Sequence, residues 1–112
     1  MARKILVVDD TRNMQTLLKD FLEKQNYEVL LAFDGIEATD VFEKKHPDMI
    51  LLDIMMPRMD GFQFLTKLRQ TSKVPVIMIS ARQQENDIIK GFELGADDYI
   101  CKPFRLRELL MR

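Results

Sequence analysis

The residues of this chain that could do chemistry together stand at the ends of short apolar segments. They are Asp9 and Asp10 at the end of KILVVDD, Asp53 at the end of DMILLD, Ser80 at the end of VPVIMIS, and Lys102 after DDYIC. Carboxylates gathered in one place repel one another and resist ionisation unless a cation lies among them. An all-oxygen site of this kind suits Mg²⁺ or Mn²⁺, which also accept phosphate oxygens. The residue types therefore indicate metal-assisted chemistry on a phosphoryl group.

Each of these side chains has a definite role in such a reaction. With a cation bound, Asp53 can attack phosphorus and form an aspartyl phosphate. The cation and the compact ammonium group of Lys102 would neutralise charge on the phosphoryl oxygens, and the Ser80 hydroxyl can donate a hydrogen bond to one of them. Structural alternatives stay open, because Asp10 could cap a helix and Ser80 could be an ordinary helix-entry residue.

The elements that must position these residues alternate along the chain. Apolar, strand-length runs are expected at 4–9, 27–32, 48–53, 74–80 and 97–101. Between and after them, helical spacing of apolar residues predicts helices over 11–25, 36–45, about 62–68, about 84–94 and from 105 onward. Strands that are apolar on nearly every residue imply a parallel sheet covered by helices on both faces, a doubly wound α/β fold. Functional sites of such folds lie outside the carboxyl ends of the strands, where the strand-end residues above would meet.

Composition excludes several classes of function. The chain has 112 residues, enough for one globular domain, and a net charge of −1, so no global charge attracts nucleic acid or an anionic membrane. Its apolar runs are far shorter than the roughly 20 residues that span a bilayer, and its start lacks the apolar stretch of a signal peptide. We therefore expect a cytoplasmic protein with no membrane partner.

Four motifs in this order, ILVVDD, PDMILLDIMMPRMDG, PVIMISA and GADDYICKPF, resemble the receiver domain of bacterial two-component response regulators. The resemblance covers nearly the whole chain. It implies a (βα)5 flavodoxin-like fold with strand order 2-1-3-4-5 and phosphorylation of one aspartate by a sensor histidine kinase. Such a domain is a phosphoacceptor and not an enzyme, although it assists its own Mg²⁺-dependent phosphorylation and dephosphorylation.

The resemblance also implies a role for each matching residue. Asp53 would be the phosphoacceptor and Lys102 the phosphate-binding lysine, with a cis bond to Pro103. Asp10, its acidic companion Asp9, Asp53 and the backbone carbonyl of Met55 would bind the metal. Ser80 and Tyr99 would form the switch pair, although Tyr99 could also be an ordinary strand residue.

The output is a further implication of the resemblance. Residues 1–112 are expected to form one receiver domain, truncated within its last helix and lacking its effector domain. The tail GADDYICKPFRLRELLMR is most similar to that of winged-helix transcriptional regulators of the OmpR/PhoB type, which implies DNA binding through the missing domain. In that class phosphorylation changes the face formed by the fourth helix, fifth strand and fifth helix and promotes a homodimer. The matching charged positions are Asp97, Asp98, Glu108 and Arg112.

Three other functions stay open from the sequence. A stand-alone receiver could act through protein contacts alone. A flavin- or nucleotide-binding module of the same fold would want a loop rich in glycine, serine or threonine after the first strand, where this chain has DDTRNMQ. A phosphatase with an aspartate nucleophile would usually need a second acid and a cap over the substrate, and no insertion is long enough to be one.

Overall fold

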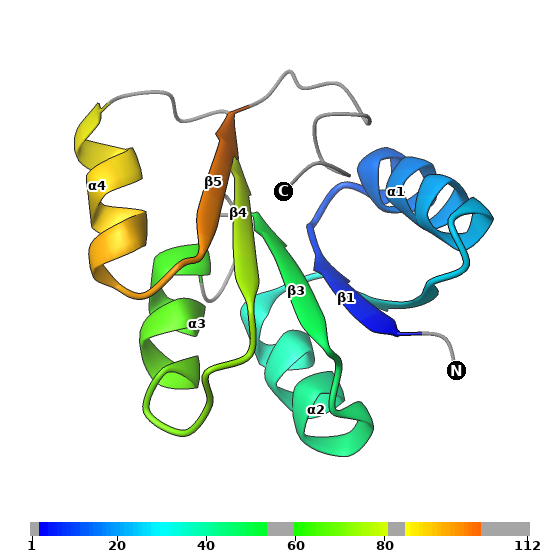
Figure 1. The fold of residues 1–112 in the computed structure, drawn as a ribbon, viewed down its shortest axis with the longest axis horizontal. Coiled ribbons are helices and arrows are strands. Elements are labelled where there is room, and N and C mark those ends of the chain that lie inside the picture. Colours follow the sequence, from blue (N-terminus) through cyan, green and yellow to red (C-terminus); the bar gives the residue numbers. More distant parts are fainter. Residues whose placement is uncertain (1–2, 54–59, 81–84, 102–112) are drawn as a thin grey trace.

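The structure, a computed structural model, describes residues 3–53, 60–80 and 85–101. A parallel sheet with strand order β2-β1-β3-β4-β5 forms its centre (Figure 1). The strands are β1 (Lys4–Val8), β2 (Glu28–Ala32), β3 (Met49–Asp53), β4 (Val76–Ser80) and β5 (Asp98–Cys101). The described helices are α1 (Arg12–Lys24), α2 (Gly35–Lys45), α3 (Gly61–Leu68) and α4 (Glu85–Glu93). The predicted doubly wound parallel sheet and its strand order are confirmed.

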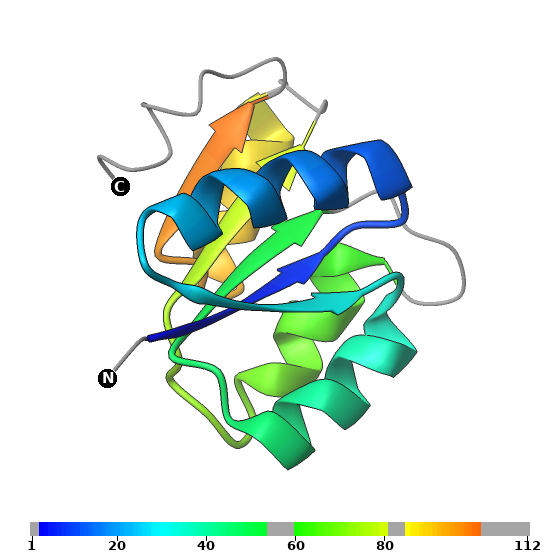
Figure 2. The ribbon, with the colours of Figure 1, turned by 90° about the vertical axis from the view of Figure 1, so that its right-hand side faces the viewer.

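Helices cover both faces of the sheet, so the central strands are buried on either side (Figure 2). Along β1, Ile5 and Val7 point toward α1 and pack with its Leu18 and Leu22. Leu6 and Val8 point to the opposite face, into a larger core that includes residues of α2 and α3. This alternation explains why β1 is apolar at consecutive positions. Each fully buried aliphatic side chain contributes roughly 1.5–3 kcal/mol, so the strand ends are held by a rigid framework.

Two helices begin with caps that the sequence encodes. The Asp60 carboxylate accepts a hydrogen bond from the backbone N–H of Gln63, whose side chain accepts one in return from the Asp60 N–H. This reciprocal pair is a capping box, and it fixes the start of α3. Asp34 likewise caps α2 by accepting from the N–H of Glu37. Asp34 therefore has a local, structural role at the turn before Gly35.

Predicted and observed boundaries differ by small amounts. The fourth strand was expected from residue 74, but its pairing with β3 begins at Val76, opposite Ile50. Pro75 has no N–H to give to the ladder, although its carbonyl accepts from the N–H of Ile50, so the strand begins after it. The predicted last helix, from residue 105, lies outside the described residues. No helix in the described ranges is both long and apolar enough to cross a membrane.

Candidate functional site

An acidic cluster lies at the carboxyl end of the two central strands β1 and β3. Asp9 directly follows β1, Asp10 comes next, and Asp53 is the last residue of β3. The two strands are paired with Val8 opposite Leu52, so Asp9 and Asp53 occupy neighbouring positions just beyond this pair. One carboxylate oxygen from each of the three aspartates lies within 4.8 Å of the others. The structure therefore brings together the acidic residues that the sequence singled out.

Burial divides the cluster into an inner and an outer part. Asp9 and Asp53 are 2% and 4% exposed, whereas Asp10 is exposed. The Asp9 N–H donates to the carbonyl of Ala32, which extends the β1–β2 pairing by one residue, and one Asp9 carboxylate oxygen accepts from the N–H of Thr11 at 2.8 Å. The Asp9 carboxylate is thus fixed by the first loop, Asp53 is buried at the end of β3, and Asp10 is on the solvent side of the site.

The alternative structural role of Asp10 as a helix cap is not the one observed. The N-cap of α1 is Thr11, and no side chain there makes the capping hydrogen bond. The Asp10 carboxylate accepts only a long 3.4 Å bond from the Thr11 hydroxyl among the hydrogen bonds described for it. None of the hydrogen bonds described for Asp10 caps α1, which favours a role for its carboxylate in the acidic cluster.

The geometry of the cluster fits a divalent cation bound by oxygen. Octahedral Mg²⁺, with metal–oxygen distances of about 2.1 Å, places neighbouring ligand oxygens about 3 Å apart and opposite ones about 4.2 Å apart. The separations of up to 4.8 Å between the Asp9, Asp10 and Asp53 oxygens need only small side-chain rotations to meet these values. Three carboxylates also leave positions for water or a phosphoryl oxygen, as Mg²⁺ usually requires.

The predicted switch residues lie on β4, which pairs with β3, and on β5, the next strand of the sheet. Ser80 ends β4 opposite Cys101, and the preceding residue of β4, Ile79, pairs with Asp53. The backbone of Ser80 is therefore at the same sheet edge as the acidic cluster. Tyr99, within β5, is 7% exposed and belongs to the core cluster covered by α4.

Helix α4 approaches Tyr99 closely at a glycine. A Cβ atom added to Gly91 would lie 3.1 Å from Cδ2 of the Tyr99 ring and 3.1 Å from the sulfur of Met78. These distances are shorter than ordinary van der Waals contacts, so the absence of a side chain at Gly91 allows the helix to sit directly on the ring. A change in the position of the Tyr99 ring would therefore displace α4 or alter its packing.

The predicted dimer-face residues are only partly within the described ranges. Asp97 and Asp98 are described, and both carboxylates take part in contacts within the chain. An Asp97 oxygen accepts from the Val76 N–H at 2.8 Å and from the Arg69 guanidinium at 3.2 Å, and an Asp98 oxygen accepts from the Tyr99 N–H. Predictions for Met55, Lys102, Glu108 and Arg112, and for the bond to Pro103, lie outside the described residues.

Arg69 is a residue that sequence reasoning missed. Its guanidinium donates to the carbonyls of Gly95, Ser72 and Val74 in addition to the Asp97 carboxylate. These contacts join the loop after α3 to the loop before β5. No sequence pattern predicts these hydrogen bonds, because the carbonyl partners of Arg69 are backbone atoms up to 26 residues away.

Gln15 was also missed, although a signal for it existed. Its position on α1 falls on the same stripe as Leu18 and Leu22, three and seven residues further on, and all three are buried. A glutamine in an apolar stripe must find hydrogen-bond partners, and Gln15 finds them at the strand ends, as described below.

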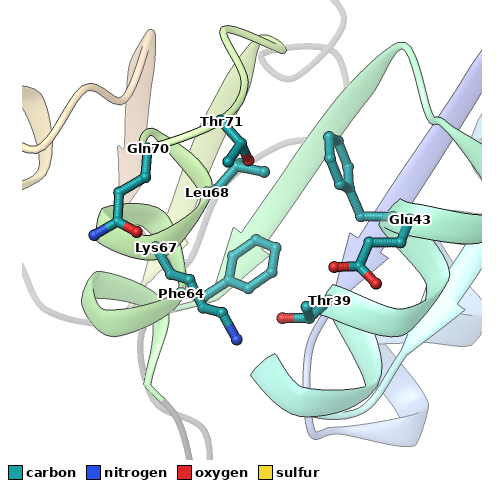
Figure 3. A pocket seen from close by; sticks show the side chains of 8 residues that line it. Thr39, Glu43, Phe64, Lys67, Leu68, Gln70 and Thr71 are labelled. Atoms are coloured by element: carbon teal, nitrogen blue, oxygen red, sulfur yellow. The ribbon is translucent and has the colours of Figure 1, made fainter.

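A separate pocket of about 160 Å³ opens between α2 and α3 (Figure 3). The residues that line it come from the middle and last turns of α2, from α3 and from the turn after α3: Thr39, Phe42, Glu43, Phe64, Lys67, Leu68, Gln70 and Thr71. Helices in this fold run antiparallel to the strands that they connect, so the carboxyl ends of α2 and α3 face the amino ends of the strands. The pocket shares no residue with the acidic cluster and is not part of the candidate site.

Comparison with known proteins identifies the class. The family model of the response regulator receiver domain matches residues 5–112, so the chain belongs to the response regulator receiver family. Receiver domains are phosphoacceptor domains that work with histidine kinases in two-component signalling. The resemblance inferred from the four motifs is confirmed at this level.

Solved structures of response regulators are similar to this chain in sequence and in fold. The receiver domain of the Francisella response regulator 1452 is 38% identical, with a TM-score of 0.94 over 98% of this chain and 92% of that one. The BeF3-activated N-terminal receiver domain of RstA from Klebsiella pneumoniae is 33% identical, with a TM-score of 0.95 over 98% and 94% of the two chains. The chemotaxis protein CheY4 of Vibrio cholerae is 32% identical, with a TM-score of 0.93 over 99% and 95%.

Proposed function

We propose that Asp53 of this receiver domain accepts a phosphoryl group from a sensor histidine kinase in a Mg²⁺-dependent reaction. The observation that carries the proposal is the cluster of Asp9, Asp10 and Asp53 oxygens within 4.8 Å at the carboxyl end of the central strands. Family membership supports the same conclusion, since receiver domains bind Mg²⁺ at an acidic pocket.

Each residue of the site has a different role in the proposed reaction. Asp9, Asp10, Asp53 and the Met55 carbonyl would hold Mg²⁺ or Mn²⁺, which supplies positive charge to the phosphoryl oxygens when bound. A carboxylate oxygen of Asp53 attacks phosphorus, the phosphorus–nitrogen bond of the donor phosphohistidine breaks, and the imidazole leaves. Lys102 neutralises charge on the transferred group. The same charges assist the later attack of water, so the domain promotes its own phosphorylation and dephosphorylation without being an enzyme.

The rigidity of β3 supports the choice of Asp53 as the acceptor. Leu51 and Leu52, which precede it, are 2% and 0% exposed and belong to opposite faces of the core. A strand fixed on both faces delivers the carboxylate to one place with little freedom. Asp10 lacks such a framework, because it lies in an exposed loop, and is better suited to follow a cation than to receive the phosphoryl group.

The signal would leave the site through Ser80 and Tyr99. A phosphoryl group on Asp53 draws the Ser80 hydroxyl toward it, and the space left behind lets the Tyr99 ring change its position. Because α4 contacts the ring directly at Gly91, this movement would alter the face made by α4, β5 and the segment after β5. That two-state change is the proposed switch.

The proposed output is control of transcription by a winged-helix DNA-binding domain outside this sequence, acting in the cytoplasm. The switched face would form a phosphorylation-enhanced homodimer through Asp97, Asp98, Glu108 and Arg112. The bonds from Asp97 to Arg69 and Val76 mean that one of its oxygens is already engaged within the chain. Exposed ion pairs contribute only about 0–1 kcal/mol each, so we expect this dimer to be weak.

Phosphorylation by a small phosphodonor tests the central part of the proposal. The wild type, Asp53→Asn and the control Asp20→Asn, which changes an exposed aspartate on α1, are incubated with acetyl phosphate and with Mg²⁺ or a chelator. Acid-labile labelling is expected in the wild type and in Asp20→Asn, only with Mg²⁺, and is expected to be lost in Asp53→Asn because an amide does not attack phosphorus. Labelling of Asp53→Asn at the wild-type level would contradict the proposal.

A further inference from the structure

Gln15 is a polar side chain enclosed by the core of the domain. Only 1% of its surface is exposed, and it shares the buried stripe of α1 with Leu18 and Leu22, which pack against the sheet. Figure 2 shows this helix running back over one face of the sheet from its start near the carboxyl end of β1. A primary amide is costly to bury without partners, so its contacts indicate what the position requires.

The Gln15 amide bridges two strand ends beneath the acidic cluster. Its nitrogen donates to the carbonyl of Asp9 at 2.9 Å and to the carbonyl of Ala32 at 2.7 Å. The Ala32 carbonyl also accepts from the N–H of Asp9 at 3.1 Å. Both N–H bonds of the amide are used, and they tie α1 to the ends of β1 and β2.

The hydrogen bond from Gln15 to the Asp9 carbonyl also affects the position of Asp10. The Asp9 carbonyl belongs to the same planar peptide unit as the nitrogen of Asp10. A donor that fixes the carbonyl therefore fixes the plane in which the chain enters Asp10. The Asp9 carboxylate is held from the other side by the Thr11 N–H at 2.8 Å, whereas Asp10 is exposed and depends more on its backbone for its position.

We propose that Gln15 is a positioning residue for the metal site: by holding the Asp9–Asp10 peptide, it places these two carboxylates within reach of the Asp53 carboxylate. Gln15 itself does not touch the cation, and the inference rests on the proposed Mg²⁺ site. Groups that orient metal ligands from behind commonly affect metal affinity almost as much as the ligands do.

The test compares Mg²⁺ affinity in the wild type, Gln15→Met and Leu18→Ala. Methionine has a similar length but no donor, so it removes both bonds with little change in volume. Leu18→Ala is the matched control, since it also disturbs the buried stripe of α1 and makes no described contact with Asp9. Folding is checked by the amide NMR spectrum, and the dissociation constant is obtained by titrating MgCl₂ into each folded variant.

We expect Gln15→Met to bind Mg²⁺ about tenfold more weakly than the wild type, and Leu18→Ala to lose stability while keeping wild-type affinity. Equal affinity in Gln15→Met and wild type, or an equal loss in Leu18→Ala, would overturn the inference while leaving the proposed function intact. A wild type that binds no Mg²⁺ would overturn both. If Gln15→Met does not fold, Gln15→Leu, which is also apolar and has no side-chain donor, is subject to the same expectation and the same refutation.

Discussion

Neutralising Asp10 should stabilise the domain when no cation is bound. The three carboxylates of the acidic cluster lie within 4.8 Å of one another, so without metal their mutual repulsion is present in the folded state. In the unfolded chain Asp53 is far from the other two, and most of that repulsion disappears. Asp10→Asn keeps the shape of the side chain and removes its charge, which makes it a suitable perturbation.

The expected size of the effect follows from Coulomb's law. Two unit charges 4.8 Å apart repel by about 0.9 kcal/mol in bulk water and by about 3.5 kcal/mol at an effective dielectric of about 20. Asp10 is exposed but Asp53 is buried, so the repulsion between these two carboxylates lies between the two values, at about 2 kcal/mol, and physiological salt reduces it by roughly half. The repulsion between Asp10 and its sequence neighbour Asp9 persists in the unfolded chain, so removing the Asp10 charge should raise the free energy of unfolding by about 1 kcal/mol.

The assay is urea unfolding of wild type, Asp10→Asn and Asp20→Asn in the presence of a chelator. Asp20 is exposed on α1 and is not part of the cluster, so its substitution should change stability by no more than about 0.5 kcal/mol. With saturating Mg²⁺ the wild type should gain more stability than Asp10→Asn, because binding to the folded state stabilises it by mass action and the variant binds more weakly. An Asp10→Asn protein that is no more stable than wild type in chelator would refute the repulsion argument.

Three further predictions concern the framework and the output face. Arg69→Leu should lower the free energy of unfolding by about 2–4 kcal/mol in urea titrations, since it removes a partly buried guanidinium from three carbonyls and a carboxylate; a change below about 0.5 kcal/mol would contradict it. Gly91→Ala should lower the free energy of unfolding by about 1 kcal/mol, because crowding of the Tyr99 ring costs about 2 kcal/mol and the better helix propensity of alanine offsets about 1 kcal/mol. A raised melting temperature would show that the Tyr99 ring moves aside at no cost. In sedimentation of the beryllofluoride-treated protein, Arg112→Glu should weaken the dimer more than Lys67→Glu, a change on α3 outside the predicted dimer residues, whereas a strictly monomeric wild type at high micromolar concentration would rule the dimer out.

The sequence was sufficient for the architecture because the periodicities are strong. Strands such as KILVV and MILLD are apolar at successive positions, which only a sheet covered on both faces allows, and the winding then gathers Asp9, Asp10 and Asp53 at one edge. Strand ends were less well predicted. The fourth strand begins after Pro75 because hydrogen bonding, and not hydrophobicity, sets its limit.

What the sequence could not supply is the set of bonds between side chains and distant backbone atoms. The place of Gln15 in the apolar stripe of α1 indicates that it is buried, but it does not indicate that its partners are the two carbonyls at the strand ends. Arg69 likewise has partners fixed by loop geometry, and Asp97 has a contact with it that no charge pattern specifies. The closeness of α4 to Tyr99 at Gly91 also depends on how the helix packs, which the sequence alone does not state.

The central claim, that Asp53 is the residue that carries the phosphoryl group, is tested most directly by mapping the modification. The wild type is treated with acetyl phosphate and Mg²⁺, and the acyl phosphate is then reduced with borohydride, which converts a phosphorylated aspartate to homoserine. Peptide mass spectrometry locates the converted residue. Homoserine at position 53, in the phosphodonor-treated sample alone, is the predicted result, whereas homoserine at Asp9, Asp10 or another aspartate, or at none, would contradict the account.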